Sequence, residues 1–209
     1  MSFYPFYPSP KNFTQKKKGY RFFPAEEVSV RIVVENLFGF WPPVELLTGL
    51  LGAISSSEIF LGTLRNGLYA EHYETEQLGL TGHCRLSHSR KGELVLLQEL
   101  NILRTEKRVR GEGTTIFQRQ VECCRQLGIR RIIMFGRRNR LECGYYVLPR
   151  FGFDTRLPQK IQSLLPAEFR QPPTLKALFR TAEGKNWWKR YGSTLACPLV
   201  YCVNENEKW

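Results

Sequence analysis

Along much of the chain, apolar and polar residues alternate with the two-residue period of a β-strand. This pattern predicts strands over residues 28–38, 67–74, 80–89, 93–103, 129–136, 153–157 and 193–203. The turn-prone sequence Ser-Arg-Lys-Gly at 89–92 predicts a hairpin between two of them. The continuous apolar run within 129–136 is typical of a strand buried in parallel pairing, and Pro198 places the last strand at an edge or a bulge.

Other segments carry apolar residues at the spacing of an α-helix. Helices are predicted over residues 42–54 and 55–67, within 108–128, and over 140–152 and 158–179, the last with proline breaks. Ser55 and Glu58 fit a capping box at the start of the second helix. The apolar face of the helix within 108–128 consists of Ile116, Phe117, Val121, Cys124 and Leu127. Arg119 and Arg125 point away from this face.

The start of the helix within 108–128 combines arginines with two glycines, Gly111 and Gly113. One interpretation is a flexible turn before a surface helix. The other is a loop that binds a phosphate, because the first N–H groups of a helix are unpaired and the helix dipole is positive there. The spacing fits neither a P-loop, which needs a Lys and a Ser or Thr, nor a dinucleotide fingerprint, which needs a third glycine.

The charge of the chain favours an anionic partner. The 209 residues include 31 Lys and Arg against 19 Asp and Glu, for a net charge of +12. Much of the excess lies in residues 104–140, which hold eleven basic side chains and three acidic ones. A nucleic acid, a phosphorylated cofactor or an acidic surface would each be attracted, although a solvated basic face would have the same composition.

Other features narrow the class of protein. Residues 1–24 are predicted to form an extended basic and aromatic arm, and residues 25–209 a single domain. The cysteines do not form a disulfide framework, and the histidine- and cysteine-containing stretch 72–88 fits no zinc spacing, so we expect no metal. Since no apolar leader is evident and charged residues and prolines interrupt the stretch 33–54, a cytoplasmic protein without a membrane span is expected.

The spacing Arg-x-x-Gly-x-Gly at Arg108, Gly111 and Gly113 resembles the pyrophosphate loop of the GNAT superfamily of acyl-CoA N-acyltransferases. A second element of that family, an aromatic helix that ends in an apolar residue before Gly-Phe, is matched by residues 145–153. Together the two elements cover roughly residues 95–157. The resemblance implies a mixed α/β fold in which two neighbouring parallel strands splay apart, here with an insertion at about 158–180.

The resemblance also implies acetyl-CoA as the acyl donor and direct attack of an amine on its thioester, without an acyl-cysteine. The cofactor-binding residues that it implies are Leu103, Arg108, Val109, Arg110, Gly111, Glu112, Gly113, Thr114 and Asn139. Members of the family often have a tyrosine that acts as general acid at the position of Leu148. Because leucine cannot take this role, the nearby Tyr145 and Tyr146 are the candidate acids. Glu99, on the strand before the loop, is either a general base or an outward residue in a salt bridge.

The amine acceptor is predicted to enter a basic and aromatic groove formed by residues 43–66, 145–180 and 185–191. Arg156 and Trp188 are predicted to contact it, although a tryptophan near a final strand more often fills a core. The positive charge would attract an anionic carrier of the amine, such as an aminoacyl-tRNA. A non-catalytic protein of the same fold that binds RNA remains the alternative.

Overall fold

The structure is a computed structural model that describes residues 16–17, 20–22, 27–54, 57–64, 67–74, 80–102, 111–136, 144–170, 174–192 and 198–204. For residues 16–17, 20–22, 74, 80 and 99–102, the description covers the backbone alone. The strands are β1 (Lys16–Lys17), β2 (Tyr20–Phe22), β3 (Glu58–Leu64), β4 (Gly67–Glu74), β5 (Leu80–His88), β6 (Leu94–Ile102), β7 (Arg131–Phe135) and β8 (Pro198–Cys202). The helices are α1 (Glu27–Phe38), α2 (Val44–Leu50), α3 (Glu112–Gln126), α4 (Gly144–Arg150), α5 (Gln159–Gln162), the 3-10 helix η2 (Ala167–Phe169), α6 (Leu175–Leu178) and α7 (Ala182–Tyr191).

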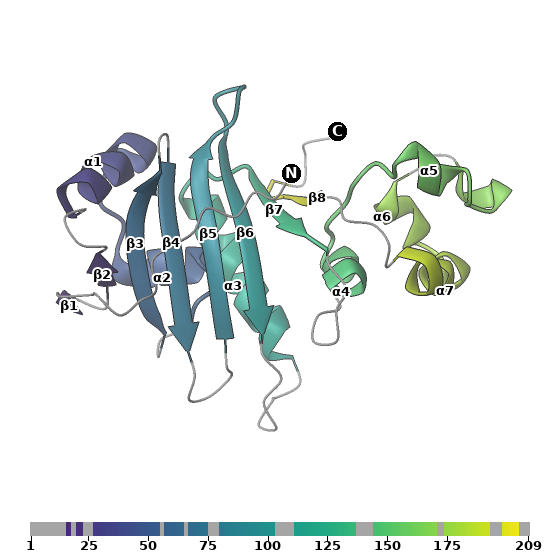
Figure 1. The fold of residues 1–209 in the computed structure, drawn as a ribbon, viewed down its shortest axis with the longest axis horizontal. Helices are drawn as coiled ribbons and strands as arrows, with labels where there is room; N and C mark the ends of the chain where they lie inside the picture. The colour runs from purple at the N-terminus through teal and green to yellow at the C-terminus, as the bar shows by residue number, and fades with distance from the viewer. Residues whose placement is uncertain are drawn as a thin grey trace.

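The strands form one mixed sheet in which spatial order follows chain order (Figure 1). From β3 to β6 the sheet is an antiparallel meander. β6 and β7 are parallel and are joined through α3, and β8 closes the sheet as an antiparallel edge. The predicted mixed α/β architecture, the parallel strand and the proline-bearing edge strand are therefore confirmed.

Three helices cover one face of the β3–β6 sheet. Val30 and Val34 of α1 and Leu47 of α2 are fully buried, in one core with alternate residues of β3 to β6. The predicted apolar face of α3 packs into the same core, and Figure 1 shows α2 and α3 behind the sheet. No helix in the described part of the chain is long and apolar enough to cross a bilayer.

Two predicted elements are wrong. Residues 28–38 form the helix α1 rather than a strand, because Val30 and Val34 lie one helical turn apart on its buried face. Residues 58–64 form the strand β3 rather than a helix, because they pair with strands on both sides. Ser55, the proposed cap residue, lies outside the described residues, and Glu58 begins the strand.

The remaining predicted elements agree with the structure, except that the strand predicted at 153–157 is reduced to isolated bridges. The strands at 67–74, 80–89 and 93–103 are present as β4, β5 and β6, and the hairpin between the last two closes where Gly92 N–H donates to Ser89. Residues 153–157 form only two isolated bridges, from Asp154 to Val200 and from Arg156 to Thr174. Residues 158–179 form α5, η2 and α6, separated at prolines as predicted.

The C-terminal helical unit, residues 158–192, lies beside the sheet beyond β7 and β8 (Figure 1). Asp154 attaches it to the sheet. The backbone of Asp154 pairs with Val200 of β8, and its carboxylate accepts hydrogen bonds from the N–H groups of Thr155 and Lys176 at 2.8 and 2.7 Å. The first turn of α6 is thereby fixed to the edge strand.

Candidate functional site

The parallel strands β6 and β7 separate at their carboxyl ends. They pair from Val95 with Arg131 as far as Gln98 with Met134. Beyond that point β6 continues to Ile102 paired with β5, and Phe135 of β7 pairs with β8. Among the described residues, the backbone edge of β6 that faces β7 thus has no strand partner after Gln98. This is the splayed arrangement expected from the sequence.

The N-terminus of α3 lies at the same end of the sheet, since α3 follows β6 directly in a crossover to a parallel strand. Gly111 is the N-cap, with φ of +102°, a left-handed conformation that favours glycine, and no side chain caps the helix. The Gly111 carbonyl accepts hydrogen bonds from the N–H groups of Thr114 and Thr115 at 3.0 and 3.2 Å. The N–H groups of Glu112 and Gly113 precede the first helical bonds and point out of the helix end.

Part of the predicted cofactor loop falls outside the described residues. Leu103, Arg108, Val109, Arg110 and Asn139 belong to that group. Among the described residues, Glu112 and Gly113 are half-buried, whereas Gly111 and Thr114 are exposed. The four therefore form the accessible end of a 15-residue helix, where an anion gains from both N–H groups and the helix dipole.

A buried polar junction lies at the point where β6 and β7 separate. Gln98, the last residue of β6 paired with β7, donates to the Leu51 carbonyl at 2.9 Å. Gln120 of α3 donates to the Leu50 carbonyl at 2.7 Å and to the Gln98 side-chain oxygen at 2.5 Å. Both side chains are 1% exposed. The junction thus joins the end of α2, the middle of α3 and the strand at the separation point.

Neither glutamine was identified from the sequence as part of the site. The available signal was that Gln120 stands four residues after Ile116 and next to Val121, on the apolar face of the helix. Gly52, with φ of +68°, leaves room for the junction, since a Cβ there would lie 3.1 Å from the Gln98 amide nitrogen.

The opposite face of the sheet carries a group of titratable side chains. Tyr69, Glu71 and Tyr73 alternate along β4 and point away from the core that α1, α2 and α3 form. Both tyrosine hydroxyls donate hydrogen bonds to the Glu71 carboxylate. Burial and the Glu71 carboxylate raise the pKa of Tyr73 above its ordinary value.

The strand register extends this group across three strands. Glu71 of β4 lies opposite His83 of β5, and His83 lies opposite Glu99 of β6. Cross-strand partners share a face of the sheet, so the three positions form one row on the face opposite the helices. Glu99, the predicted base, is the first residue of β6 after its pairing with β7 ends. The sequence indicated Glu99 but not Tyr69, Glu71 or Tyr73, whose signal was the polar alternation within 67–74.

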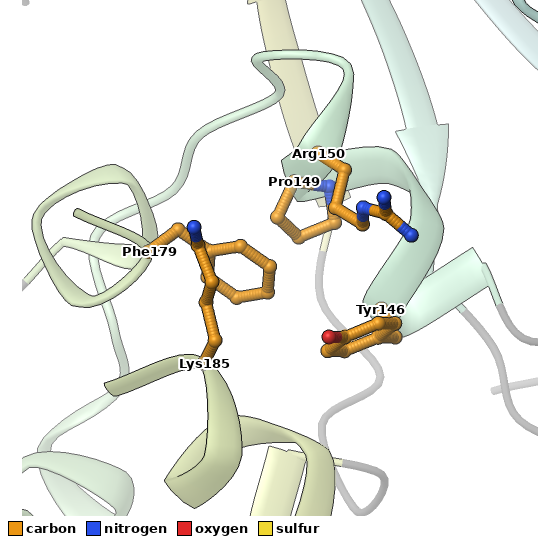
Figure 2. Close-up of a pocket in the computed structure, with 5 residues that line it drawn as sticks. All are labelled: Tyr146, Pro149, Arg150, Phe179 and Lys185. Atoms are coloured by element: carbon orange, nitrogen blue, oxygen red, sulfur yellow. The ribbon is translucent and has the colours of Figure 1, made fainter. Parts of the chain in front are cut away.

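The two predicted acids on α4 lie in different surroundings. Tyr145 is buried, and its hydroxyl donates to the Lys189 carbonyl at 3.3 Å. Tyr146 is half-buried and faces a cavity (Figure 2). Leu148 is buried in the core, as is expected for an apolar residue on the inner side of this helix.

Of the two predicted acceptor contacts, Arg156 is exposed but Trp188 is not. Trp188 is 1% exposed, and its indole N–H donates to the Tyr145 carbonyl at 2.8 Å. Pro149, four residues after Tyr145, has no N–H with which to bond that carbonyl within the helix. Trp188 therefore supplies the missing donor from α7, and its ring holds α4 and α7 together instead of facing solvent.

No protein-family model matches the chain, and no curated protein matches it. Among solved structures, the chain is similar to Arabidopsis thaliana Naa50 in complex with the bisubstrate analogue CoA-Ac-MVNAL. The identity is 16% and the TM-score 0.31, over 62% of this chain and 80% of that chain. It is also similar to N-acetylglutamate synthase from Neisseria gonorrhoeae complexed with coenzyme A and N-acetyl-glutamate. There the identity is 11% and the TM-score 0.31, over 88% of this chain and 34% of the synthase chain.

Similarity at these TM-scores does not assign an activity, which has to come from the residues of this chain. Three features meet at the carboxyl ends of β6 and β7: a strand edge that pairs with no strand of the described ranges, an accessible helix N-terminus and a row of titratable residues. The edge offers amide groups to an extended ligand, the helix end offers N–H groups to an anion, and the row offers groups that exchange protons. Within the described residues, no group of three or more His, Cys, Asp or Glu is placed to hold a metal.

Proposed function

We propose that the protein is an acetyl-CoA-dependent N-acetyltransferase of the GNAT type. The observation that carries this proposal is the separation of β6 from β7 directly beside a helix that begins at a left-handed glycine. The pyrophosphate of acetyl-CoA binds the N–H groups of residues 109–114, and its pantetheine arm lies along the edge of β6 after Gln98. The basic loop residues Arg108 and Arg110 add charge for the phosphates.

The reaction is transfer of the acetyl group from sulfur to nitrogen. The deprotonated amine attacks the thioester carbonyl, the negative charge on its oxygen is stabilised by backbone N–H groups, and the carbon–sulfur bond breaks. The thiolate then takes a proton, and the products are an amide and CoA. The proton lost by the amine passes to a base on the protein or to water.

Glu99 is the proposed base, because the register puts it next to the separated edge and in line with His83 and Glu71. Tyr69 and Tyr73 hold the Glu71 carboxylate in one orientation by donating to both of its oxygens. On α4, Tyr146 is the better candidate acid, since the Tyr145 hydroxyl already donates to Lys189.

Three of the six cysteines are poor candidates for an acyl-cysteine, which favours direct attack. Cys84, Cys123 and Cys124 are buried. Burial raises the pKa of Cys84 to about 12 and also raises the pKa of Cys123 and of Cys124. A thiol with a raised pKa carries little thiolate at neutral pH and is a poor nucleophile.

Isothermal titration calorimetry with acetyl-CoA, together with release of free thiol in the presence of amines, tests the proposal. Replacing both loop glycines, in Gly111→Glu with Gly113→Glu, puts two carboxylates where the pyrophosphate would bind. We expect this variant to lose at least about 100-fold in affinity, because two carboxylates would repel the pyrophosphate at the helix end that binds it. Gln118→Glu is the control, because it adds a negative charge on the exposed side of the same helix.

Absence of acetyl-CoA binding by the unaltered protein would refute the proposal. Equal affinities for the glycine variant and the Gln118→Glu control would place the cofactor elsewhere. Acceptors can be sought by mass spectrometry of a cell extract incubated with the protein and labelled acetyl-CoA.

A further inference from the structure

A cavity of about 410 Å³ lies between α4 and the C-terminal helical unit. Figure 2 shows Tyr146, Pro149 and Arg150 of α4 on one side, with Phe179 and Lys185 facing them from the other. The volume is within the range of cavities that bind small molecules. The cavity is on the side of α4 that faces α6 and α7, whereas α3 lies behind the sheet (Figure 1). None of its lining residues belongs to α3, although Phe151, which follows α4, packs against Phe117 of α3 with ring centroids 5.1 Å apart.

The walls of the cavity are held by contacts that do not depend on a ligand. Trp188 of α7 bonds to the Tyr145 carbonyl, next to the wall residue Tyr146. At Gly184, a Cβ would lie 2.0 Å from the Leu178 carbonyl oxygen, so α7 approaches α6 as closely as glycine allows. Thr181 caps α7 by accepting a hydrogen bond from the Gly184 N–H at 3.0 Å. Lys185 and Phe179 are thus in fixed positions relative to α4.

The lining combines aromatic surface with positive charge. The rings of Tyr146 and Phe179 have centroids 5.8 Å apart and are tilted by 51°. With Pro149 they form an apolar wall on which a flat ring can stack. Arg150 and Lys185 are exposed at the rim, and no carboxylate of the described residues forms an ion pair with either of them. A ligand that contacts both the aromatic wall and the two cations carries a planar ring and a phosphate.

The surface around the cavity also combines basic side chains with aromatic rings. Residues 144–192 contain nine Lys and Arg side chains and three Asp and Glu. One of the three, Asp154, is engaged by backbone N–H groups. Further along α7, the rings of Trp187 and Tyr191 are 5.1 Å apart and the Arg190 guanidinium lies over Tyr191. A second exposed ring with an adjacent cation is what a chain of nucleotides requires from its binding surface.

We propose that this cavity binds a nucleotide, with the base against Tyr146 and Phe179 and the phosphate between Arg150 and Lys185. The nucleotide belongs to single-stranded RNA, whose neighbouring nucleotides pass around α7 to the Trp187–Tyr191 pair, about half a helical turn away from Lys185. An acidic peptide would engage the two cations but leave the rings without a stacked partner. The inference does not rest on acetyl transfer: the cavity shares only Tyr146, the candidate acid, with the proposed transferase, and neither test variant changes that residue or the loop 108–114.

Fluorescence anisotropy of the full chain with a labelled oligoadenylate RNA of about ten nucleotides tests the proposal. The test variant, Arg150→Glu with Lys185→Glu, reverses both rim charges. The control, Lys160→Glu, changes an exposed lysine of α5 outside the cavity. We expect the double variant to lose at least about tenfold in affinity and to reduce the slope of log K against log salt by about 1.4. Lys160→Glu should change affinity by less than about twofold.

Two further arms separate the possible sources of the nucleotide. If adenosine 5′-monophosphate displaces the RNA and binds as tightly as the RNA does, the ligand is a free nucleotide. The cavity is then still a nucleotide site. Displacement of the RNA by acetyl-CoA, with acetyl-CoA affinity lost in the Arg150→Glu, Lys185→Glu variant, would overturn the proposal by assigning the cavity to the cofactor. Equal losses per reversed charge in the test and control variants would overturn it as well, since binding would then follow net charge. Failure of acetyl-CoA to bind at all would refute the proposed transferase and leave this result unchanged.

Discussion

His72 projects from β4 into the core, on the face opposite Glu71. It is 1% exposed, and neither ring nitrogen makes a hydrogen bond of good geometry within the described residues. Burial lowers the pKa of His72 from 6.5 to about 4, since a charged imidazole would be desolvated there, and the nearby Leu51 backbone offsets only part of this effect. The folded protein thus keeps this histidine neutral at pH values where the unfolded chain protonates it.

The consequence for stability has a definite sign. Below pH 6.5 the unfolded state binds a proton that the folded state does not, so stability falls as the pH is lowered toward 4. Between about pH 7.5 and about pH 5 we expect the free energy of unfolding to decrease by about 2 kcal/mol through His72 alone. Urea denaturation at a series of pH values measures the change.

Two variants isolate the contribution of His72. His72→Leu removes the titrating group and should flatten this part of the pH profile, whatever its effect on stability near neutral pH. His88→Gln, at the exposed end of β5, should retain the slope. A slope that persists in His72→Leu would assign the pH dependence to other groups.

At the scale of elements, the glutamine junction determines how α2, α3 and β6 fit together. In Gln120→Ala, the Leu50 carbonyl and the Gln98 side-chain oxygen both lose a donor and a small cavity forms. We expect the free energy of unfolding to fall by about 2–4 kcal/mol. Gln118→Ala, on the exposed side of the same helix, should change it by less than about 0.5 kcal/mol. Similar urea midpoints for the two variants would show that the junction does not stabilise the fold.

The two mistaken elements show where pattern analysis loses information. In residues 28–38 valine and isoleucine satisfy both periods, since Val28, Val30 and Ile32 alternate while Val30 and Val34 are four apart. The helix places Val28 and Ile32 in solvent, 71% and 54% exposed, which no local rule anticipates. A local cue did favour helix, namely the Glu27 and Arg31 pair four residues apart that forms an ion pair.

Those parts of the candidate site that depend on local sequence were predictable, and those that depend on contacts between distant residues were not. The helix after Gly111 follows from its amphipathic pattern, whereas the left-handed conformation of Gly111 is seen only in the structure. The row of Glu71, His83 and Glu99 depends on strand register, which connects residues far apart in the chain. Trp188 was placed in the acceptor groove because the sequence does not reveal that Pro149 leaves a carbonyl for it to bind.

For the whole molecule, the link between α4 and α7 fixes the C-terminal helical unit to the sheet. Trp188→Phe keeps most of the ring but removes the indole N–H, which leaves the Tyr145 carbonyl buried without a donor. We expect a loss of about 1–3 kcal/mol in unfolding free energy. In a Pro149→Ala background, the substituted residue would restore an N–H within α4, so Trp188→Phe should cost less there. A double-mutant cycle by urea denaturation measures the coupling, and purely additive effects would contradict this account of the tryptophan.

The agreement of strand order with chain order bears on how the protein is made. As the chain leaves the ribosome, each strand up to β7 meets a partner that has already been synthesised, so the sheet can grow in one direction. β8 is different, because residues 136–197 must emerge before it can pair with β7. Until then β7 is an open edge, and Asp154 lacks the strand to which it fixes the helical unit. A transcript truncated only a few codons before β8 would therefore yield an aggregation-prone chain rather than a slightly shortened protein.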